Sequence, residues 1–456
     1  MMSMGLHTLA ARLHGQWTGS PDAAISAVGT DTRAVTPGML FVALRGERFD
    51  GHHYVQHALQ AGAAAVVVDH DVRDQCPEAA ERQLIVADTR LALGLLAGIV
   101  RDRWQGTMIA LTGNSGKTTV KEMVLTLLSE AVGEEAVLAT EGNLNNDIGV
   151  PLTLLRLNDQ HRYAVVELGA NHIGEIAWTS ALARPDVAII TNVTGAHVGE
   201  FGSMGMIAQA KGEILTATSP AGRAVLPAAD HYLPLWQSLA ARQLHTAPEL
   251  FGIDHVEGWH VRDCHPQPNG FSFTLCHQDH VLGQVQLPML GRHNVVNALA
   301  AAAAVHAVGV SDAAIVAGLS HCTSYAQRML CLQGVRGTRV LDDSYNANPG
   351  AMKAALETLA AQPGPHWCFM GAMGELGAAS DQLHADVGRY AGDLGITLIT
   401  FGEAARPAAL AANGQHFDDW EALVAFALRS LPEGGSVLVK GSHAMHMERL
   451  VQQLRG

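Results

Sequence analysis

The chain has 456 residues, and at about 150 residues per domain this length favours about three domains. With 48% hydrophobic and 16% charged residues, its composition is that of a globular protein and not of a disordered one. The net charge of −14 argues against a broad nucleic-acid surface, although a local basic pocket could still hold an anionic small molecule.

Cysteine usage and the N-terminal residues both indicate a cytoplasmic protein. The six cysteines include no C-x-x-C pair, which favours a reduced compartment over a disulfide scaffold. The first residues lack the charged start and apolar core of a secretory signal. The longest aliphatic run, Ala298 to Val305, is far shorter than the roughly 20 residues of a membrane helix, so we expect no membrane insertion.

Residues 1–86 form the first predicted unit, with short apolar strands at Leu40–Leu44 and Ala63–Val68. Guanidinium groups suit phosphate and carboxylate ligands, so the arginines of the polar stretch between residues 30 and 52 could face an anion. From composition alone, ordinary solvated charges are the better interpretation. These arginines are Arg33, Arg45 and Arg48.

The stretch from Ala110 to Glu122 predicts a nucleotide phosphate site. An apolar strand leads into a loop, and the helix that follows has apolar residues every three or four positions. The loop therefore lies at a helix N-terminus, where unpaired N–H groups and the helix dipole favour a polyphosphate. Gly113 and Gly116 would let the backbone come close to it.

Two side chains of the same loop suit nucleotide chemistry. Lys117 can reach the terminal phosphates, and the Thr118 hydroxyl can ligate Mg²⁺. The strict pattern G-x-x-x-x-G-K-[ST] fails because Leu111 stands where it requires glycine. The strand before the loop and the amphipathic helix after it nevertheless favour the phosphate site over a chance Gly-Lys-Thr.

Residues 87–323 form the central predicted unit. Near-continuous apolar runs predict buried parallel strands at Tyr163–Leu168, Val187–Asn192 and Ala224–Leu226, with helices between them. A doubly wound sheet follows. Between residues 255 and 290, alternating apolar and polar residues after Asn269-Gly270 predict a β-hairpin insertion.

The hairpin contains several cysteines and histidines, but we do not expect a zinc site there. Structural zinc sites have close ligand pairs on each side, and this spacing lacks them. The residues concerned are His260, Cys264, His265, Cys276, His277 and His280.

Two residues at strand ends of the central unit are candidates for catalysis. Glu167 ends an apolar strand and suits a Mg²⁺ ligand or a water-holding carboxylate, with a capping carboxylate as the alternative. His197 follows the next strand, and a structural role is about as common for such a histidine.

Two helical segments carry further candidates. By composition Lys211 is a surface lysine. Asn294 and Asn297 are three residues apart and share a helix face, so their amides could read a base edge. Helix capping by Asn294 is the better interpretation from spacing alone.

Residues 324–456 form the third predicted unit, a second parallel α/β domain. Its strands are expected at Arg339–Asp342, Trp367–Met370, Ile396–Phe401 and Ser436–Val439, with an amphipathic helix around Met352–Leu359. Loops at the strand ends, where open α/β sheets bind ligands, are Asp342–Pro349 and Lys440–Ser442.

Taken together in chain order, seven segments resemble the Mur ligase family, and within it the ligases that add D-alanyl-D-alanine. The similarity covers nearly the whole chain. The segments are Asp31-Thr-Arg33 with Pro37-Gly-Met-Leu-Phe41, Thr112-Gly-Asn-Ser-Gly-Lys-Thr-Thr119, Gly142-Asn-Leu-Asn-Asn-Asp-Ile-Gly-Val-Pro151, Glu167-Leu-Gly-Ala-Asn-His172, Ala210-Lys-Gly-Glu213, Gly291-Arg-His-Asn294 and Asp342-Asp-Ser-Tyr-Asn-Ala-Asn-Pro349.

The resemblance implies three domains: a small N-terminal α/β domain (1–86) for a UDP sugar, a central P-loop ATPase domain (87–323) and a Rossmann-like C-terminal domain (324–456) that closes over the nucleotide and binds the dipeptide. It implies two Mg²⁺ ions held by Thr118, Glu167, His197 and a carbamylated Lys211, with Lys117 on the phosphates. The implied nucleotide-binding residues are Gly113, Asn114, Ser115, Gly116, Lys117, Thr118, Thr119, Asn294, Arg328, Asp343, Tyr345 and Asn346. The implied substrate-binding residues are Asp31, Thr32, Arg33, Asn143, Asn145 and Asn146.

Three positions depart from the family pattern. Tyr325-Ala-Gln-Arg328 stands where Pro-Gly-Arg is common, so only the arginine carries over. Ala372 replaces a common aspartate and His443 a common arginine, which bears on the finer contacts to the dipeptide.

The resemblance implies an ATP-dependent ligation of D-alanyl-D-alanine to UDP-N-acetylmuramoyl-tripeptide through an acyl phosphate. A cytoplasmic location is expected from the N-terminal residues, and a monomer is the default expectation. The third residue of the acceptor peptide is either meso-diaminopimelate or lysine. One alternative is a sibling amide ligase, such as a folylpolyglutamate synthase or another Mur step. A P-loop switch or motor is the other, and it leaves the Asp-Thr-Arg segment and the second α/β unit unexplained.

Overall fold

The computed structural model describes residues 5–19, 25–47, 49–194 and 198–455. The chain divides into two compact units. The first comprises Met1–Ala110, Gly133–Gly169 and Glu175–Asp186, and the second Leu111–Val132, Ala170–Gly174 and Val187–Gly456. Among the described helices, none combines the length and the apolar character that crossing a bilayer requires.

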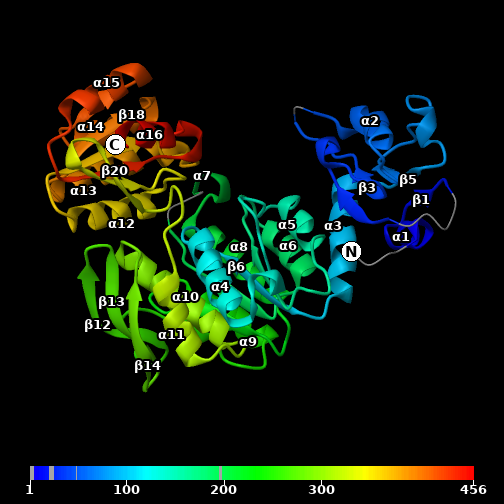
Figure 1. Cartoon of the computed structure of the whole chain (residues 1–456), viewed down its shortest axis with the longest axis horizontal. Helices are drawn as coiled ribbons and strands as arrows, with labels where there is room; N and C mark the ends of the chain where they lie inside the picture. The colour runs from blue at the N-terminus through cyan, green and yellow to red at the C-terminus, as the bar shows by residue number, and fades with distance from the viewer. Residues whose placement is uncertain (1–4, 20–24, 48, 195–197, 456) are drawn as a thin grey trace. The chain divides into compact units, whose positions relative to one another are not determined.

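Three sheets organise the strands that Figure 1 labels. The first has the order β1-β5-β4-β3-β2, with β1 antiparallel to β5 and the other neighbours parallel. The two strands expected in this region are present as β3 and β4, and both are buried. The strands are β1 (Gln16–Trp17), β2 (Ala27–Gly29), β3 (Met39–Val42), β4 (Ala65–Val68) and β5 (Gln83–Ile85).

The second sheet has nine strands in the order β14-β13-β12-β11-β10-β9-β6-β8-β7. The predicted strands of the central unit are present as β8, β9 and β10, and β9 to β12 pair in parallel. The strands are β6 (Thr107–Thr112), β7 (Val137–Ala139), β8 (Tyr163–Glu167), β9 (Val187–Ile190), β10 (Arg223–Pro227), β11 (Glu249–Phe251), β12 (Trp259–Gln267), β13 (Gly270–His277) and β14 (His280–Leu287).

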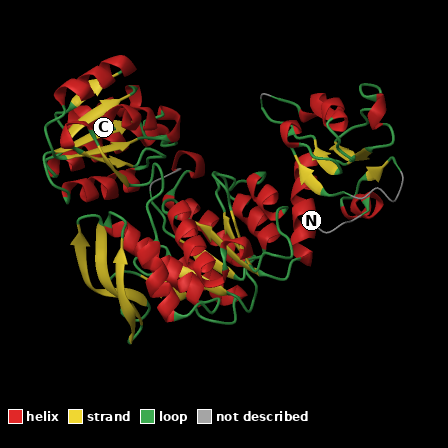
Figure 2. Cartoon of the chain, viewed as in Figure 1, coloured by secondary structure: helices red, strands yellow, loops and turns green. Residues whose placement is uncertain are grey.

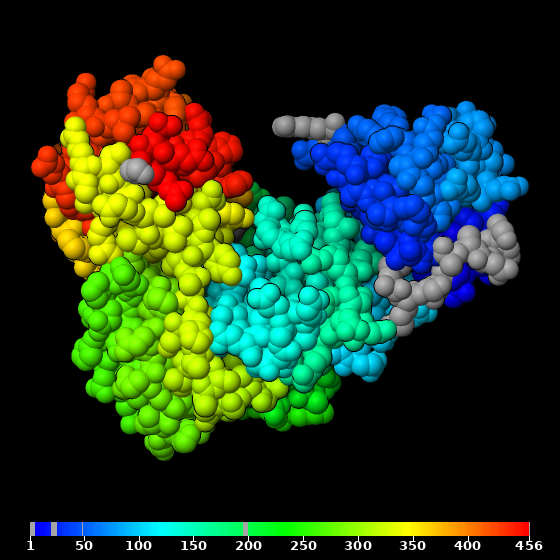
Figure 3. Space-filling view, in the orientation of Figure 1, coloured from blue at the N-terminus to red at the C-terminus, as the bar shows by residue number. Residues whose placement is uncertain are grey.

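The hairpin expected between residues 255 and 290 is larger than a single hairpin. β12 and β13 join at Asn269-Gly270 as predicted, and β14 adds a third antiparallel strand. β12 also pairs in parallel with β11 at Phe251 and Trp259, so the three strands continue the second sheet. They lie at the surface of the second unit, in the green region of Figure 3.

The third sheet has the order β15-β16-β20-β17-β18-β19. All four strands expected in this region are present. Two strands that were not expected are added at the edges, β15 antiparallel to β16 and β19 parallel to β18. The strands are β15 (Leu330–Gln333), β16 (Arg339–Asp342), β17 (His366–Gly371), β18 (Thr397–Phe401), β19 (Gln415–Phe417) and β20 (Ser436–Lys440).

Side chains at successive positions along the strands of the third sheet point to opposite faces, and each face contributes to a separate hydrophobic core. Leu341 and Leu438 pack with helices on one face, and Val340 and Val439 pack with helices on the other. Figure 2 shows helices on both sides of this sheet. A sheet buried on both faces explains why its strands read as continuous apolar runs.

The α-helices are α1 (Leu6–Arg12), α2 (Val55–Gln60), α3 (Thr89–Arg103), α4 (Lys117–Val132), α5 (Gly149–Leu154), α6 (Glu175–Ala183), α7 (Val198–Phe201), α8 (Met204–Thr216), α9 (Leu233–Gln243), α10 (Arg292–His306), α11 (Asp312–His321), α12 (Pro349–Ala360), α13 (Ser380–Asp393), α14 (Arg406–Ala411), α15 (Trp420–Ser430) and α16 (Glu448–Leu454). The predicted phosphate-loop helix is α4, and its expected apolar face is buried.

Candidate active site

The predicted phosphate loop connects β6 to α4 and holds both of its glycines at positive φ, +147° for Gly113 and +79° for Gly116. Space is as restrictive as conformation at these positions. A Cβ on Gly113 would lie 1.9 Å from Thr191 Oγ1, and a Cβ on Gly116 would lie 2.6 Å from Asn297 Oδ1. Both positions therefore require glycine even before a nucleotide is considered.

Thr191 and Asn192, just after β9, hold the loop in place. The Thr191 hydroxyl and the Asn192 side-chain amide donate to the Ser115 carbonyl at 2.7 and 3.0 Å. In return, Asn192 accepts the N–H of Ser115 through Oδ1 at 3.0 Å and the N–H of Asn114 through its carbonyl at 3.1 Å. The sequence reasoning missed this pair, although two polar residues at the carboxyl end of a buried strand were a usable signal.

Lys117 and Thr118 begin α4, at the end of the helix where the dipole favours negative charge. Lys117 Nζ donates to the Gly113 carbonyl at 2.8 Å, so the ammonium folds back over the loop. Arg328 donates through Nη2 to the Thr118 hydroxyl at 3.2 Å. Thr119, the next residue of the predicted loop, is buried.

Two residues from beyond α11 reach the loop. The guanidinium of Arg328 lies 4.0 Å from the centroid of the Tyr345 ring, which holds it flat beside Thr118. Asn348 caps α12 through Oδ1, and its Nδ2 donates to the Ser115 hydroxyl at 3.0 Å. This segment therefore contacts the phosphate loop within the second unit, and its expected approach to a nucleotide stays a prediction.

Asp343 and Asn346 have structural partners. Lys440, which is buried at the end of β20, donates to Asp343 Oδ2 at 2.6 Å and to the Asn346 carbonyl at 2.8 Å. Asp343 Oδ1 accepts the N–H of Met329 at 3.1 Å. Lys440 thus fixes the loop after β16 beside the segment that carries Arg328.

Asn294 is buried in the first turn of α10, but it does not cap the helix. The N-cap is Gly291, so the interpretation of Asn294 as a cap is wrong. Asn294 Nδ2 donates to the Leu290 carbonyl at 2.7 Å, and its Oδ1 accepts from Asn297 Nδ2 at 3.0 Å. The expected shared face of the two asparagines is confirmed, and it places Asn297 against Gly116.

Glu167 ends β8 with its side chain buried, as expected for a strand-end carboxylate. Asn145 Nδ2 donates to Glu167 Oε1 at 2.7 Å, so two predicted site residues of the first unit are in contact. Asn146 accepts the N–H groups of Ile148 and Gly149 through its side-chain oxygen, just before α5. Asn143 is exposed.

Lys211 is not the surface lysine that composition suggested. It lies in α8 with 1% of its surface exposed, and its Nζ is 5.7 Å from the centroid of the Phe201 ring. The sequence pattern hid this burial because the lysine stands among glycine and polar residues. His197 lies outside the described residues, so its predicted role is not addressed by the structure.

Asp31, Thr32 and Arg33 form an exposed turn in the first unit. Asp31 accepts from the Arg33 backbone N–H at 2.9 Å and pairs with Arg33 Nη2 at 2.6 Å. These hydrogen bonds from Arg33 lower the pKa of Asp31 to about 2. The turn therefore presents an ionised carboxylate beside a guanidinium.

The residue types present suit a nucleoside triphosphate and a hard cation. Gly113 and Gly116 carry no Cβ in the loop before α4, and the N-terminal end of a helix favours an anion through its dipole and the direction of its N–H groups. Thr118 of the second unit carries a hydroxyl oxygen and Glu167 of the first unit carries a carboxylate, and each by itself is a ligand type that Mg²⁺ prefers.

Of the described residues, one group brings metal-ligating atoms together, namely His52, Asp69 and His70. The hairpin cysteines and histidines are not part of it. His52 bonds through Nδ1 to Asp50, and its Nε2 accepts the N–H of Asp69 at 3.2 Å. Arg45 Nη2 also donates to Asp69 at 3.2 Å. Because both ring nitrogens of His52 are engaged, we interpret the group as a hydrogen-bond network.

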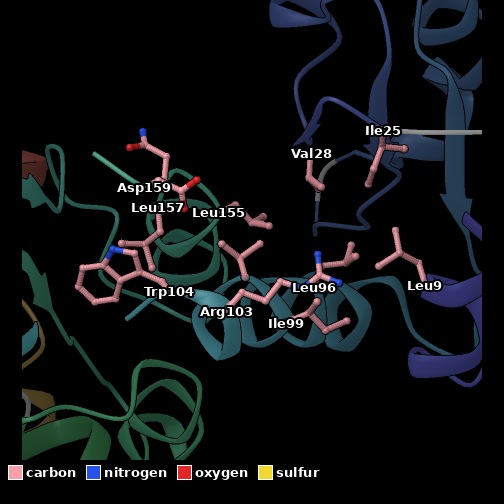
Figure 4. Close-up of a pocket in the computed structure, with 12 residues that line it drawn as sticks. Leu9, Ile25, Val28, Leu96, Ile99, Arg103, Trp104, Leu155, Leu157 and Asp159 are labelled. Atoms are coloured by element: carbon pink, nitrogen blue, oxygen red, sulfur yellow. The ribbon is translucent and has the colours of Figure 1, made fainter. Parts of the chain in front are cut away.

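A cavity of about 110 Å³ lies in the first unit, apart from the predicted site residues. Figure 4 shows Trp104, Leu155 and Leu157 on one side of it and Leu9, Ile25 and Val28 on the other, with residues of α3 between them. None of the predicted nucleotide or metal ligands lines it. The candidate active site is therefore defined by the phosphate loop and its partners.

Comparison with known proteins places the chain in a family. Residues 24–100 match the model described as Mur ligase family, catalytic domain, residues 111–305 the Mur ligase middle domain, and residues 327–443 the Mur ligase, glutamate ligase domain. The chain is 42% identical to UDP-N-acetylmuramoyl-tripeptide–D-alanyl-D-alanine ligase of Escherichia coli K12, over 100% of this chain and 99% of the relative.

Solved structures agree. A crystal structure of MurF from Acinetobacter baumannii is 37% identical, covers 100% of this chain and 99% of its own, and gives a TM-score of 0.92. MurF ligase from Thermotoga maritima in complex with ADP is 26% identical, covers 94% and 96%, and gives a TM-score of 0.83. The loop geometry, the sheet order and these similarities lead to one conclusion: the chain belongs to the Mur ligase family.

Proposed function

We propose that this chain is an ATP-dependent ligase that joins D-alanyl-D-alanine to UDP-N-acetylmuramoyl-tripeptide and releases ADP and phosphate. The product is the pentapeptide precursor of peptidoglycan. The observation that carries the proposal is the glycine loop bonded to Arg328 and Asn348, two residues from the C-terminal part of the chain. The identity of 42% to the Escherichia coli ligase supports the same reaction.

The reaction requires activation of a carboxylate, which is a poor electrophile. Transfer of the γ-phosphoryl group of ATP converts the terminal carboxylate of the tripeptide into an acyl phosphate. The free amine of the dipeptide then attacks the acyl carbon, and phosphate leaves. Positioning and charge neutralisation supply most of the rate in phosphoryl transfer.

Lys117 and the first turn of α4 would bind the phosphates, and Asn294 and Arg328 would approach the base and the phosphate side of the nucleotide. Asn294 would have to share an amide that already bonds to Leu290 and Asn297. Thr118, Glu167, His197 and a carbamylated Lys211 would hold two Mg²⁺ ions, which lower the charge on the transferring phosphoryl group.

The acceptor would be bound mainly by the first unit. Asp31, Thr32 and Arg33 suit the UDP sugar because the turn carries an exposed guanidinium, 87% of whose side chain is accessible. Asn143, Asn145 and Asn146 would contact the acceptor beside Glu167. We propose a monomer acting in the cytoplasm, with domains bounded at residues 86 and 323.

A phosphate-release assay with product mass analysis tests the proposal. The purified chain is given ATP, Mg²⁺, D-alanyl-D-alanine and UDP-N-acetylmuramoyl-tripeptide carrying either meso-diaminopimelate or lysine. We expect sustained phosphate release only when both the acceptor and the dipeptide are present. The product should be heavier than the acceptor by the mass of one D-alanyl-D-alanine unit. ATP hydrolysis at a rate that depends on neither substrate would identify a switch or motor. In a parallel reaction with a folate and glutamate, addition of glutamate would identify a sibling ligase.

A further inference from the structure

His384 is a buried histidine that the reaction above does not use. It lies in α13 with no exposed surface. Its Nδ1 is 2.8 Å from the Ser380 carbonyl, and its Nε2 accepts the N–H of Met373 at 2.9 Å. A carbonyl can only accept and a backbone N–H can only donate, so these two partners fix a neutral ring with its proton on Nδ1.

The surroundings of His384 oppose protonation. Burial lowers its pKa below 6.5, while the Ser380 carbonyl and the Asp381 carboxylate act in the opposite direction. Charged groups on the packed helices have partners of their own. Glu357 of α12 accepts the Tyr390 hydroxyl, and Arg406 of α14 pairs with Asp418.

Met373 belongs to the loop Gly371–Gly377, which follows β17 and contacts two other segments of the second unit. Its Ala372 carbonyl accepts the N–H of Ser442 at 3.0 Å. Its Glu375 carbonyl accepts the N–H of Gly199 in α7 at 3.3 Å. The loop and α7 touch so closely that a Cβ on Gly199 would lie 2.7 Å from the nitrogen of Gly377.

The same short helix leads to Lys211. Phe201, the last residue of α7, packs with Ile207 and Ala210 of α8. Its ring lies 5.7 Å from Lys211 Nζ. A continuous series of contacts therefore runs from His384 through Met373 and Glu375 to Gly199, and from Phe201 to Lys211.

We propose that neutral His384 is a positioning residue, which holds the Gly371–Gly377 loop against α7 and so fixes Phe201 beside Lys211. The inference rests on the proposed participation of Lys211 in the reaction. Protonation of His384 would turn Nε2 into a donor facing the N–H of Met373. The loop would then lose its anchor, and turnover would fall in acid without any change at the phosphate loop.

Two substitutions of His384 distinguish the effect of its protonation from the effect of losing its hydrogen bond to Met373. Glutamine can accept from Met373 through its carbonyl and does not titrate, so His384→Gln should keep most of its kcat and lose the acid fall, which burial of His384 moves below the ordinary titration range of histidine. Leucine leaves the buried N–H unpaired, so His384→Leu should lower kcat roughly tenfold at every pH with KM for ATP unchanged. An acid limb that survives unchanged in His384→Gln would overturn the proposal.

A second pair of variants tests the route through α7. Gly199→Ala forces the loop away without touching His384, so it should lower kcat, and His384→Leu added to it should cost little more. Gly205→Ala is the matched control, because its Cβ would meet nothing closer than 3.9 Å. Fully multiplicative losses from His384→Leu and Gly199→Ala would contradict the coupling.

Thermal unfolding of each variant excludes simple loss of fold, and His384→Gln supplies the answer if the leucine variant does not fold. Activation by bicarbonate, measured separately, tests Lys211 itself. Suppose that bicarbonate has no effect while the kcat of the double variant of His384→Leu and Gly199→Ala is no lower than that of the more impaired single variant. In that case the Lys211 assignment fails and the positioning by His384 stands.

Discussion

Arg328 donates a hydrogen bond to the hydroxyl of Thr118 across 3.2 Å, although the two residues are 210 positions apart in the sequence. The contact joins the segment after α11 to the first turn of the phosphate-loop helix. Because Thr118 is also a proposed Mg²⁺ ligand, Arg328 has to yield part of its position when a metal nucleotide binds. Its guanidinium remains stacked on Tyr345 and so stays near the developing charge.

Replacing Arg328 by lysine should weaken ADP binding roughly fivefold, or about 1 kcal/mol, because an ammonium keeps the charge and loses the planar stack on Tyr345. Isothermal titration calorimetry measures the change. Arg389→Lys, at an exposed pair with Asp386, is the control. Equal ADP affinity in Arg328→Lys and wild type would remove Arg328 from the nucleotide site.

Lys117→Ala should give a folded protein with almost no ligation. Loss of a cation at the transferring phosphoryl group costs about 3 kcal/mol or more, roughly a hundredfold or greater in kcat. The phosphate-release assay measures the loss, and circular dichroism checks the fold. Lys353→Ala, at an exposed position in α12, should leave turnover unchanged. A Lys117→Ala enzyme with near-normal turnover would refute the assignment of the loop.

Asn145→Ala should raise the Mg²⁺ concentration needed for half-maximal activity. The Asn145 amide bonds to Glu167 at 2.7 Å, and a hydrogen bond to a charged group is worth about 1.5–3 kcal/mol. Without it, Glu167 loses its fixed orientation. Asn158→Ala, on an exposed turn, serves as the control. A magnesium titration identical to wild type would mean that Asn145 does not orient the proposed ligand.

Lys211 should work as a carbamate. Its burial is costly for an ammonium, and positive charge near gathered Mg²⁺ would be unfavourable, whereas a carbamate offers two anionic oxygens. Activity should fall after incubation in CO₂-free buffer at mildly acidic pH and recover with bicarbonate. Lys211→Arg should be as inactive as Lys211→Ala, since arginine keeps the charge and does not form the carbamate. Normal turnover in the arginine variant would show that Lys211 is no metal ligand.

Local pattern sufficed for the strands that are buried on both faces, because such strands are continuous apolar runs. The strands at Val187 and Trp367 were predicted for that reason, and so was α4 from its periodic face. The phosphate loop was predictable as well, because the glycines and Lys117 are contiguous in sequence.

Contacts made over long sequence separations were not predictable in the same way. Thr191 and Asn192 support the loop from 76 and 77 residues away. Their polar character at the end of a buried strand is a local signal, but it does not identify Ser115 as their partner. Lys211 was taken for a surface residue because burial of a lysine depends on what packs around α8. Asn294 was taken for an N-cap because its residue type suits that position. The N-cap is instead Gly291, which has a positive φ.

The close seating of Gly113 on Thr191 and of Gly116 on Asn297 has a consequence for engineering. The eight residues Thr112–Thr119 could not be transplanted as a peptide into another scaffold and keep their shape. A graft would also need the end of β9 and the first two turns of α10, because the two glycines of the loop pack against residues of these segments. The transferable unit is a discontinuous three-part fragment, and a library built around the loop should vary Thr191 and Asn297 together with it.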